Sequence, residues 1–133
     1  MKNIKTILIA VFVVATLLAT AQNSKKDFYG MWTIDIEGGS VGWLNVHEDS
    51  GFLDAELLWR GGSVVPVAHV YFVDDNNLVV TRTGERVKSD DRKHVVTQTF
   101  NFKRKGDKLE GVLVEPSRDG MGANKTKFKG WKL

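Results

Sequence analysis

Five side chains of this sequence have the types and positions to bind a small molecule: Trp43, His47, Trp59, Arg60 and Gln98. Each of the two tryptophans lies beside a glycine-rich turn, and an indole at the rim of a β-protein can stack on the apolar face of a sugar. Both rings are more commonly core residues, because aromatic side chains dominate the energetics of protein cores. Arg60 could hold a carboxylate or a sugar acid through its planar fork of donors, although such an arginine is more often solvated.

His47 belongs to a polar and aromatic row. The alternation of a strand places Trp43, Asn45 and His47 on one face, with Leu44 and Val46 on the other. This row is either a ligand wall or the wet outer face of a β-barrel, and the alternation favours the outer face.

Gln98 stands among Val96, Phe100 and Phe102, which share one face of a strand. The pattern therefore predicts that its amide points inward. A buried amide needs partners, so Gln98 is either structural or directed at a ligand.

The sequence indicates no catalytic residue, metal site or cofactor. A glycosidase needs two carboxyl groups facing each other across a cleft, whereas Asp35, Glu37, Asp54 and Glu56 alternate onto solvent-facing sides of strands. The three histidines, His47, His69 and His94, do not follow a metal-binding spacing, and there is no cysteine. His69 is expected in the core. Whether the protein is an enzyme stays open at this point.

Residues 1–21 are predicted to be a secretory signal peptide. Lys2 and Lys5 precede an apolar run from Ile7 to Ala19, and Ala19-Thr20-Ala21 provides small residues for cleavage. The run is too short for a comfortable membrane span, which needs about 20 apolar residues. We therefore expect an exported protein of a bacterial envelope, periplasmic, on the outer surface or secreted, with no membrane span after cleavage.

Residues 22–133 are expected to form one domain, since about 110 residues can fold around a single core without disulfides. The leader carries two lysines and no acid, so the formal charge of +3 becomes +1 once it is removed. This small charge does not favour nucleic acid as a partner. The oligomeric state cannot be inferred from the composition.

The apolar alternation predicts an all-β domain with turns every 8 to 12 residues or so. The expected fold is an antiparallel eight-stranded up-and-down barrel, with a β-sandwich as the alternative. Pro66 indicates an edge or a bulge, and the charged stretch Thr83 to His94 is expected to be the longest loop. The predicted strands are Met31–Glu37, Trp43–Glu48, Phe52–Arg60, Val64–Val73, Leu78–Arg82, Val95–Arg104, Leu109–Glu115 and Lys125–Trp131.

Three stretches carry a resemblance to a known family: Gly39 to Leu44, Leu57 to Val67, and Val96 to Gln98, with Asn124 to Gly130 as the matching tail. They resemble a segment that precedes the 3-keto-disaccharide hydrolase domain, a glycoside-hydrolase-like domain, in exported proteins of Bacteroidetes-type bacteria. We expect this segment to stand alone, without the hydrolase-like domain. The resemblance therefore implies a non-catalytic accessory module of carbohydrate processing, with sugar binding at a rim of tryptophan and glycine. The alternative is a hydrolase acting on 3-keto-disaccharides or related glycosides, with His47 or Glu56 in its acid–base pair.

A second resemblance is to calycins, the lipocalin and streptavidin type of barrel. Gly30-Met31-Trp32 is similar to the lipocalin Gly-x-Trp motif at the start of the first strand. Lipocalins pack an arginine from the last strand over that tryptophan, whereas this chain has only lysines and Trp131 there. This resemblance implies a carrier of a small apolar ligand in an interior cavity.

Overall fold

A computed structural model describes residues 25–62, 64–87 and 91–133 of the protein. The predicted signal peptide, residues 1–21, lies outside the described residues. Nine strands form in chain order: β1 Gly30–Ile36, β2 Ser40–Asp49, β3 Phe52–Trp59, β4 Val65–Pro66, β5 His69–Asp74, β6 Asn77–Val87, β7 Lys93–Lys105, β8 Lys108–Pro116 and β9 Ala123–Lys132.

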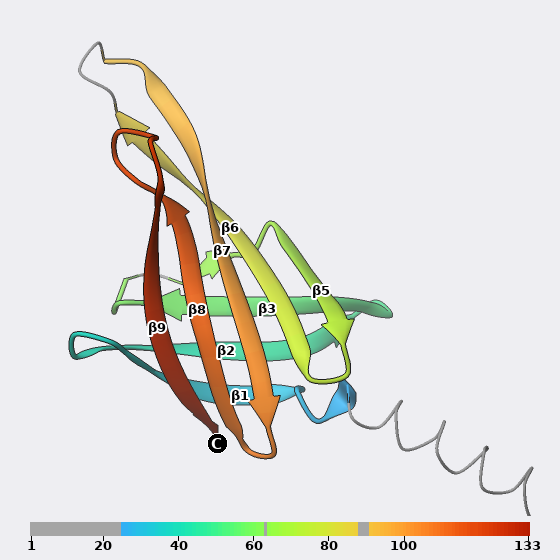
Figure 1. Ribbon diagram of the computed structural model, residues 1–133. Coiled ribbons are helices and arrows are strands. Elements are labelled where there is room, and N and C mark those ends of the chain that lie inside the picture. Colours follow the sequence, from blue (N-terminus) through green and yellow to red (C-terminus); the bar gives the residue numbers. More distant parts are fainter. Residues whose placement is uncertain (1–24, 63, 88–90) are drawn as a thin grey trace, which may run out of the picture.

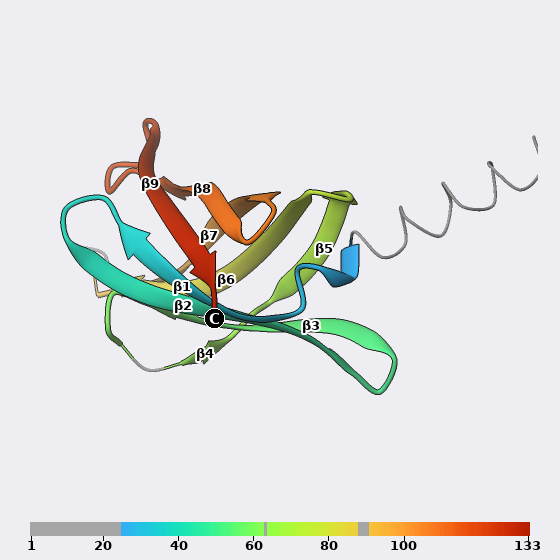
Figure 2. The ribbon, with the colours of Figure 1, turned by 90° about the horizontal axis from the view of Figure 1, so that it is seen from below.

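All nine strands belong to one antiparallel sheet in the order β4-β3-β2-β1-β9-β8-β7-β6-β5. Eight strands have 6 to 13 residues and β4 has only two, so the predicted eight-stranded all-β barrel is confirmed. The last strand β9 pairs with the first strand β1, and the rolled sheet stays open only between the β3–β4 side and β5 (Figures 1 and 2). A single continuous sheet replaces the alternative of a two-sheet sandwich.

Two expectations about the strands were wrong. The stretch Val64–Val73 is not one strand, because pairing breaks after Pro66 and resumes at His69. Pro66 lies in an edge strand, as its missing backbone donor predicted. The stretch Thr83–His94 is not mainly a loop, because β6 and β7 keep their register from Asn77↔Lys103 to Val87↔Lys93. Pairing in a long hairpin overrides the weak strand pattern of these charged residues.

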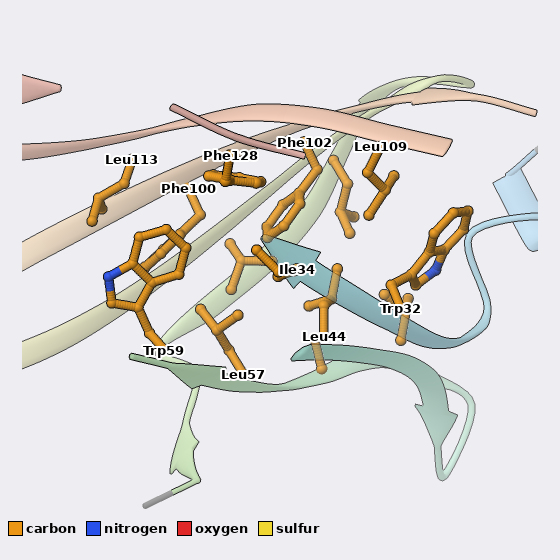
Figure 3. Close-up of a cluster of buried hydrophobic side chains, with 14 of the residues drawn as sticks. Trp32, Ile34, Leu44, Leu57, Trp59, Phe100, Phe102, Leu109, Leu113 and Phe128 are labelled. Atoms are coloured by element: carbon orange, nitrogen blue, oxygen red, sulfur yellow. The ribbon is translucent and has the colours of Figure 1, made fainter. Parts of the chain in front are cut away.

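The barrel interior is a filled core. Every second residue of each strand faces inward, and Trp32, Leu57, Phe100 and Phe128 are at most 3% exposed. Figure 3 shows these side chains meeting between the two sides of the rolled sheet. Sixteen buried apolar side chains make one cluster, which accounts for the stability of a domain without disulfides.

Phe28 is buried and packs against β5, the strand at one side of the open seam. The amide of Phe28 donates to the carbonyl of Lys25 at 3.1 Å, which forms a helical turn just before β1. The ring then packs edge-on against Phe72 of β5, with the centroids 5.5 Å apart.

No helix among the described residues is long and apolar enough to cross a membrane.

Candidate functional site

The five predicted binding residues do not form one site. Trp43 and His47 lie on the outer face of β2, and Trp59 lies on the inner face of β3. Gln98 lies on the inner face of β7, and Arg60 is exposed in the turn after β3.

The outer row of β2 is paired with the outer row of β3. Trp43 lies opposite Leu58, and the next pairs are Asn45 with Glu56 and His47 with Asp54. The side-chain amide of Asn45 donates to Glu56 Oε2 at 3.4 Å, and His47 Nε2 lies 3.6 Å from Asp54 Oδ2. This row is the outer face of the barrel, as the alternation predicted, and Asn45 and His47 each lie beside a carboxylate of β3.

Trp59 is a core residue. Its side chain is 6% exposed, and its ring meets Phe100 and Phe128 edge-on with centroid distances of 5.0 and 5.5 Å. Figure 3 shows the ring among Phe100, Phe128 and Leu113. Neither ring face is available for stacking on a sugar in this arrangement. The neighbouring Arg60 adopts a φ of 58°, which makes it part of the turn geometry, and its side chain points to solvent.

Gln98 points inward and binds two side chains that the sequence analysis did not single out. Its Oε1 accepts from Arg82 Nε at 2.6 Å, and its Nε2 donates to Glu115 Oε2 at 2.9 Å. Burial lowers the pKa of the Arg82 guanidinium, while the Glu115 carboxylate raises it. The guanidinium also lies 5.5 Å above the Phe100 ring. The three side chains form a polar cluster beside Phe100, whose ring packs against Trp59.

The opposite end of the barrel is closed around Trp32. The indole Nε1 donates to the carbonyl of Phe28 at 2.7 Å, and the ammonium of Lys132 lies 5.4 Å from the ring centroid. Lys132 also donates to the carbonyl of Asp27 at 2.8 Å. The ammonium of the last strand thus lies over the tryptophan of the Gly-x-Trp sequence.

A groove of about 810 Å³ crosses the outer face of β7, β8, β9 and β1. A cross-strand row runs through it with alternating charge, because the paired positions lie side by side. From β1 to β6 the row consists of Asp35, Lys129, Glu110, Lys103 and Asn77. A second row contains Lys127, Val112 and Asn101. The groove therefore offers hydrogen-bond acceptors and donors in alternation, with the apolar side chain of Val112 beside them.

Trp131 stands at one end of this groove. Its side chain is 42% exposed, and it lies opposite Thr33 of β1 and Lys108 of β8. The hydroxyl of Thr33 donates to the Trp131 carbonyl at 3.3 Å, which helps to hold β9 at this point. Among the four tryptophans, only Trp131 lines this groove. An exposed ring beside carboxylates, amides and lysines can bind a flat polyhydroxylated molecule.

The sequence contained a signal for Trp131. Phe128 faces inward, and an odd spacing of three residues along a strand places Trp131 on the outer face. The groove itself could not be found in this way, since it depends on the pairing of β1 with β9.

The predicted core position of His69 is wrong, because His69 is exposed at the start of β5. Among the described residues, no three histidine, aspartate or glutamate side chains are grouped to hold a metal ion.

Comparisons with protein-family models, with curated proteins and with solved structures found no match to this chain.

Proposed function

We propose that this protein is an exported, non-catalytic accessory module that binds a neutral carbohydrate in the groove beside Trp131. The observation that supports the proposal most is the groove itself. It combines one half-exposed indole with alternating carboxylates, amides and lysines on paired strands of the sheet. The predicted role in carbohydrate processing thus has a candidate site, at a different tryptophan from those that the sequence favoured.

The side chains of the groove match the two kinds of surface on a sugar ring. The indole face of Trp131 can cover the C–H face of the ring, which is apolar. Carboxylates such as Asp35 and Glu110 accept from hydroxyl groups, whereas Asn101 and Lys127 donate to them. These four side chains come from β1, β7, β8 and β9, so the hydroxyl groups of one sugar can be paired from more than one strand.

The charge of the groove favours a neutral ligand. Its lining contains three carboxylates and three lysines, so no single sign dominates. These residues are Asp35, Glu37, Glu110, Lys103, Lys127 and Lys129. Glu110 Oε2 also lies 3.3 Å from the ammonium of Lys105, outside the lining. A polyanion gains little at such a balanced surface.

The two alternative functions have less support. The acid–base candidates of a hydrolase, His47 and Glu56, are engaged with Asp54 and Asn45 on the outer face of β2 and β3, away from the groove. An interior carrier of the calycin type needs a cavity, whereas sixteen apolar side chains fill the barrel. The cation over Trp32 is similar to the lipocalin arrangement and supports a related barrel geometry, not a carried ligand.

Isothermal titration calorimetry with glucosides, 3-keto-glucosides and neutral oligosaccharides tests the proposal. We expect at least one member of the panel to bind, and Trp131→Ala to abolish that binding, because stacking on the indole is lost. Trp43→Ala is the matched control, since Trp43 is a partly exposed outer-face tryptophan outside the groove. Absence of binding across the panel, or binding that Trp131→Ala leaves unchanged, contradicts the proposal.

A further inference from the structure

The groove beside Trp131 is longer than a single sugar ring. Its lining runs from Asp35 and Glu37 on β1 to Asn77 on β6. Four strand intervals separate β1 from β6, because the order of the sheet there is β1-β9-β8-β7-β6. Neighbouring strands lie about 4.8 Å apart, so the lining spans about 20 Å. One sugar ring stacked on Trp131 would leave most of this length without a contact.

The five strands from β9 to β5 form one side of the barrel. Figure 1 shows them side by side, in front of β1, β2 and β3. The second row of the groove, which contains Lys127, Val112 and Asn101, continues on this side to Val79 of β6 and Tyr71 of β5. The row therefore ends at an aromatic side chain on the edge strand.

Tyr71 is a second aromatic side chain on the outer face of this side. Val70 and Phe72 pack against the core, so the alternation of β5 turns Tyr71 outward. Tyr71 is 52% exposed, which is similar to the exposure of Trp131 at the other end of the groove. It lies beyond the lining of the groove, on the strand next to Asn77. An exposed phenol ring can stack on a sugar as an indole does.

Val79 lies between Tyr71 and the groove, and it is covered on the outer face. It points outward, since Leu78 and Val80 on either side of it are fully buried in the core, yet it is only 6% exposed. Its direct partners on the neighbouring strands are Tyr71 and Asn101, so their side chains are placed to cover it. A tyrosine ring that lies over Val79 is directed toward the groove and keeps one face in solvent.

Trp131 and Tyr71 mark the ends of a diagonal path across five strands. Trp131 lies four residues beyond Lys127, which is the β9 member of the row that contains Tyr71. Strands lie about 4.8 Å apart and rise about 3.4 Å per residue, which puts the two positions about 23 Å apart on the sheet. The path crosses Glu110 of β8 and Asn101 of β7, which can accept and donate hydrogen bonds. Because an extended chain of pyranose rings advances by about one strand spacing per ring, about five rings cover the path.

We propose that the groove binds a linear, neutral oligosaccharide of about five sugar units, with Trp131 under one end and Tyr71 under the other. This inference rests on the proposed function and specifies its ligand. The two end rings stack on the aromatic side chains, and the rings between them are held by hydrogen bonds to the polar rows. A monosaccharide or a disaccharide at Trp131 does not reach Tyr71. The ligand is therefore a stretch of a polysaccharide and not a small sugar.

Calorimetry with neutral glucans of increasing length tests this inference. The probes are cello-, laminari- and malto-oligosaccharides, from the disaccharide to the hexasaccharide. In a series that binds, we expect the affinity to rise with each added unit and to level off after the pentasaccharide. Equal affinity for the disaccharide and the hexasaccharide, or binding of small glucosides without any of these oligosaccharides, overturns the inference and leaves the proposed function standing. If neither the oligosaccharides nor the glucosides bind, the proposed function fails and the inference fails with it.

Variants of Tyr71 separate the two ends of the path. Tyr71→Ala is expected to weaken binding of the hexasaccharide about five- to tenfold and to leave that of the disaccharide unchanged, because only the long ligand reaches this ring. Tyr71→Phe keeps the ring and should bind both sugars as the native protein does. Phe52→Ala is the matched control, since Phe52 is 76% exposed at the start of β3 and lies outside the groove. Unchanged hexasaccharide binding in Tyr71→Ala, or an equal loss in Phe52→Ala, shows that the inference is wrong.

Discussion

Trp59 and Trp131 belong to the same sheet and have opposite roles, because they lie on opposite faces of it. Trp59 is 6% exposed and meets two phenylalanine rings inside the barrel, whereas Trp131 is 42% exposed at the end of a polar groove. The glycine-rich turn that follows Trp59 made this tryptophan look like a binding residue. The comparison shows that the face of a strand, more than the neighbouring turn, decides whether a tryptophan is available to a ligand.

The largest expected effect is on the free energy of unfolding, which should fall much further when Trp59 is replaced than when Trp131 is replaced. Trp59→Ala should lower the free energy of unfolding by about 3 to 5 kcal/mol, because it leaves a cavity in the core. Trp131→Ala should lower it by about 1 kcal/mol or less, since the side chain is 42% exposed and lies outside the core. Urea unfolding followed by circular dichroism measures both values. A similar loss in the two variants would contradict the assignment of the faces.

A second prediction concerns the inner face at Gly111. A methyl group added there would overlap the ring of Phe128 and come within 2.5 Å of the carbonyl oxygen of Asn101. Gly111→Ala should therefore cost about 1 to 3 kcal/mol of unfolding free energy, as overpacking does in a filled core. Gly84→Ala in β6 is the control, because nothing lies within 4 Å of the added methyl. Thermal unfolding should show a lower midpoint for Gly111→Ala alone, and equal midpoints would mean that the core is loosely packed.

The smallest effect lies on the exterior, at Tyr29. Partial burial, together with the hydrogen bond from its hydroxyl to Glu48 at 2.7 Å, raises the pKa of Tyr29 from 10.0 to about 12. The folded protein binds this proton more tightly than the unfolded chain, so the contribution to stability is complete below pH 10 and is lost as the pH rises toward 12. Ultraviolet titration of the phenol should show a lower pKa in Glu48→Gln. A tyrosine that titrates identically in both proteins would contradict the hydrogen bond.

The barrel could be predicted from the sequence because its strands alternate clearly between apolar and polar residues. Trp32, Ile34 and Ile36 show this pattern in β1, and all three are buried. The long β6–β7 hairpin could not be predicted, since Thr83–Val87 gains its strand structure from pairing with Lys93–Thr97 and not from its own alternation. The polar partners of Gln98 were missed for a similar reason, because Arg82 and Glu115 come from neighbouring strands.

The candidate groove was harder to predict from the sequence than the barrel. Its central row joins Asp35 to Lys129 and Glu110, which come together only when β1 closes onto β9. Alternation alone indicates that these side chains are exposed, and it gives no sign that they adjoin. The resemblance to a segment of carbohydrate-processing proteins and the signal peptide stay predictions.

The position of a bound sugar on the sheet is the measurement that tests the central claim most directly. Titration of the isotope-labelled protein with the tightest-binding neutral sugar of the panel, followed by nuclear magnetic resonance, reports this position residue by residue. We expect the largest shifts at the indole of Trp131 and at the amides of Asn101 and Val112, with Trp59 unaffected. Shifts centred on Trp59 and Gln98, or no shifts with any sugar, would contradict the account.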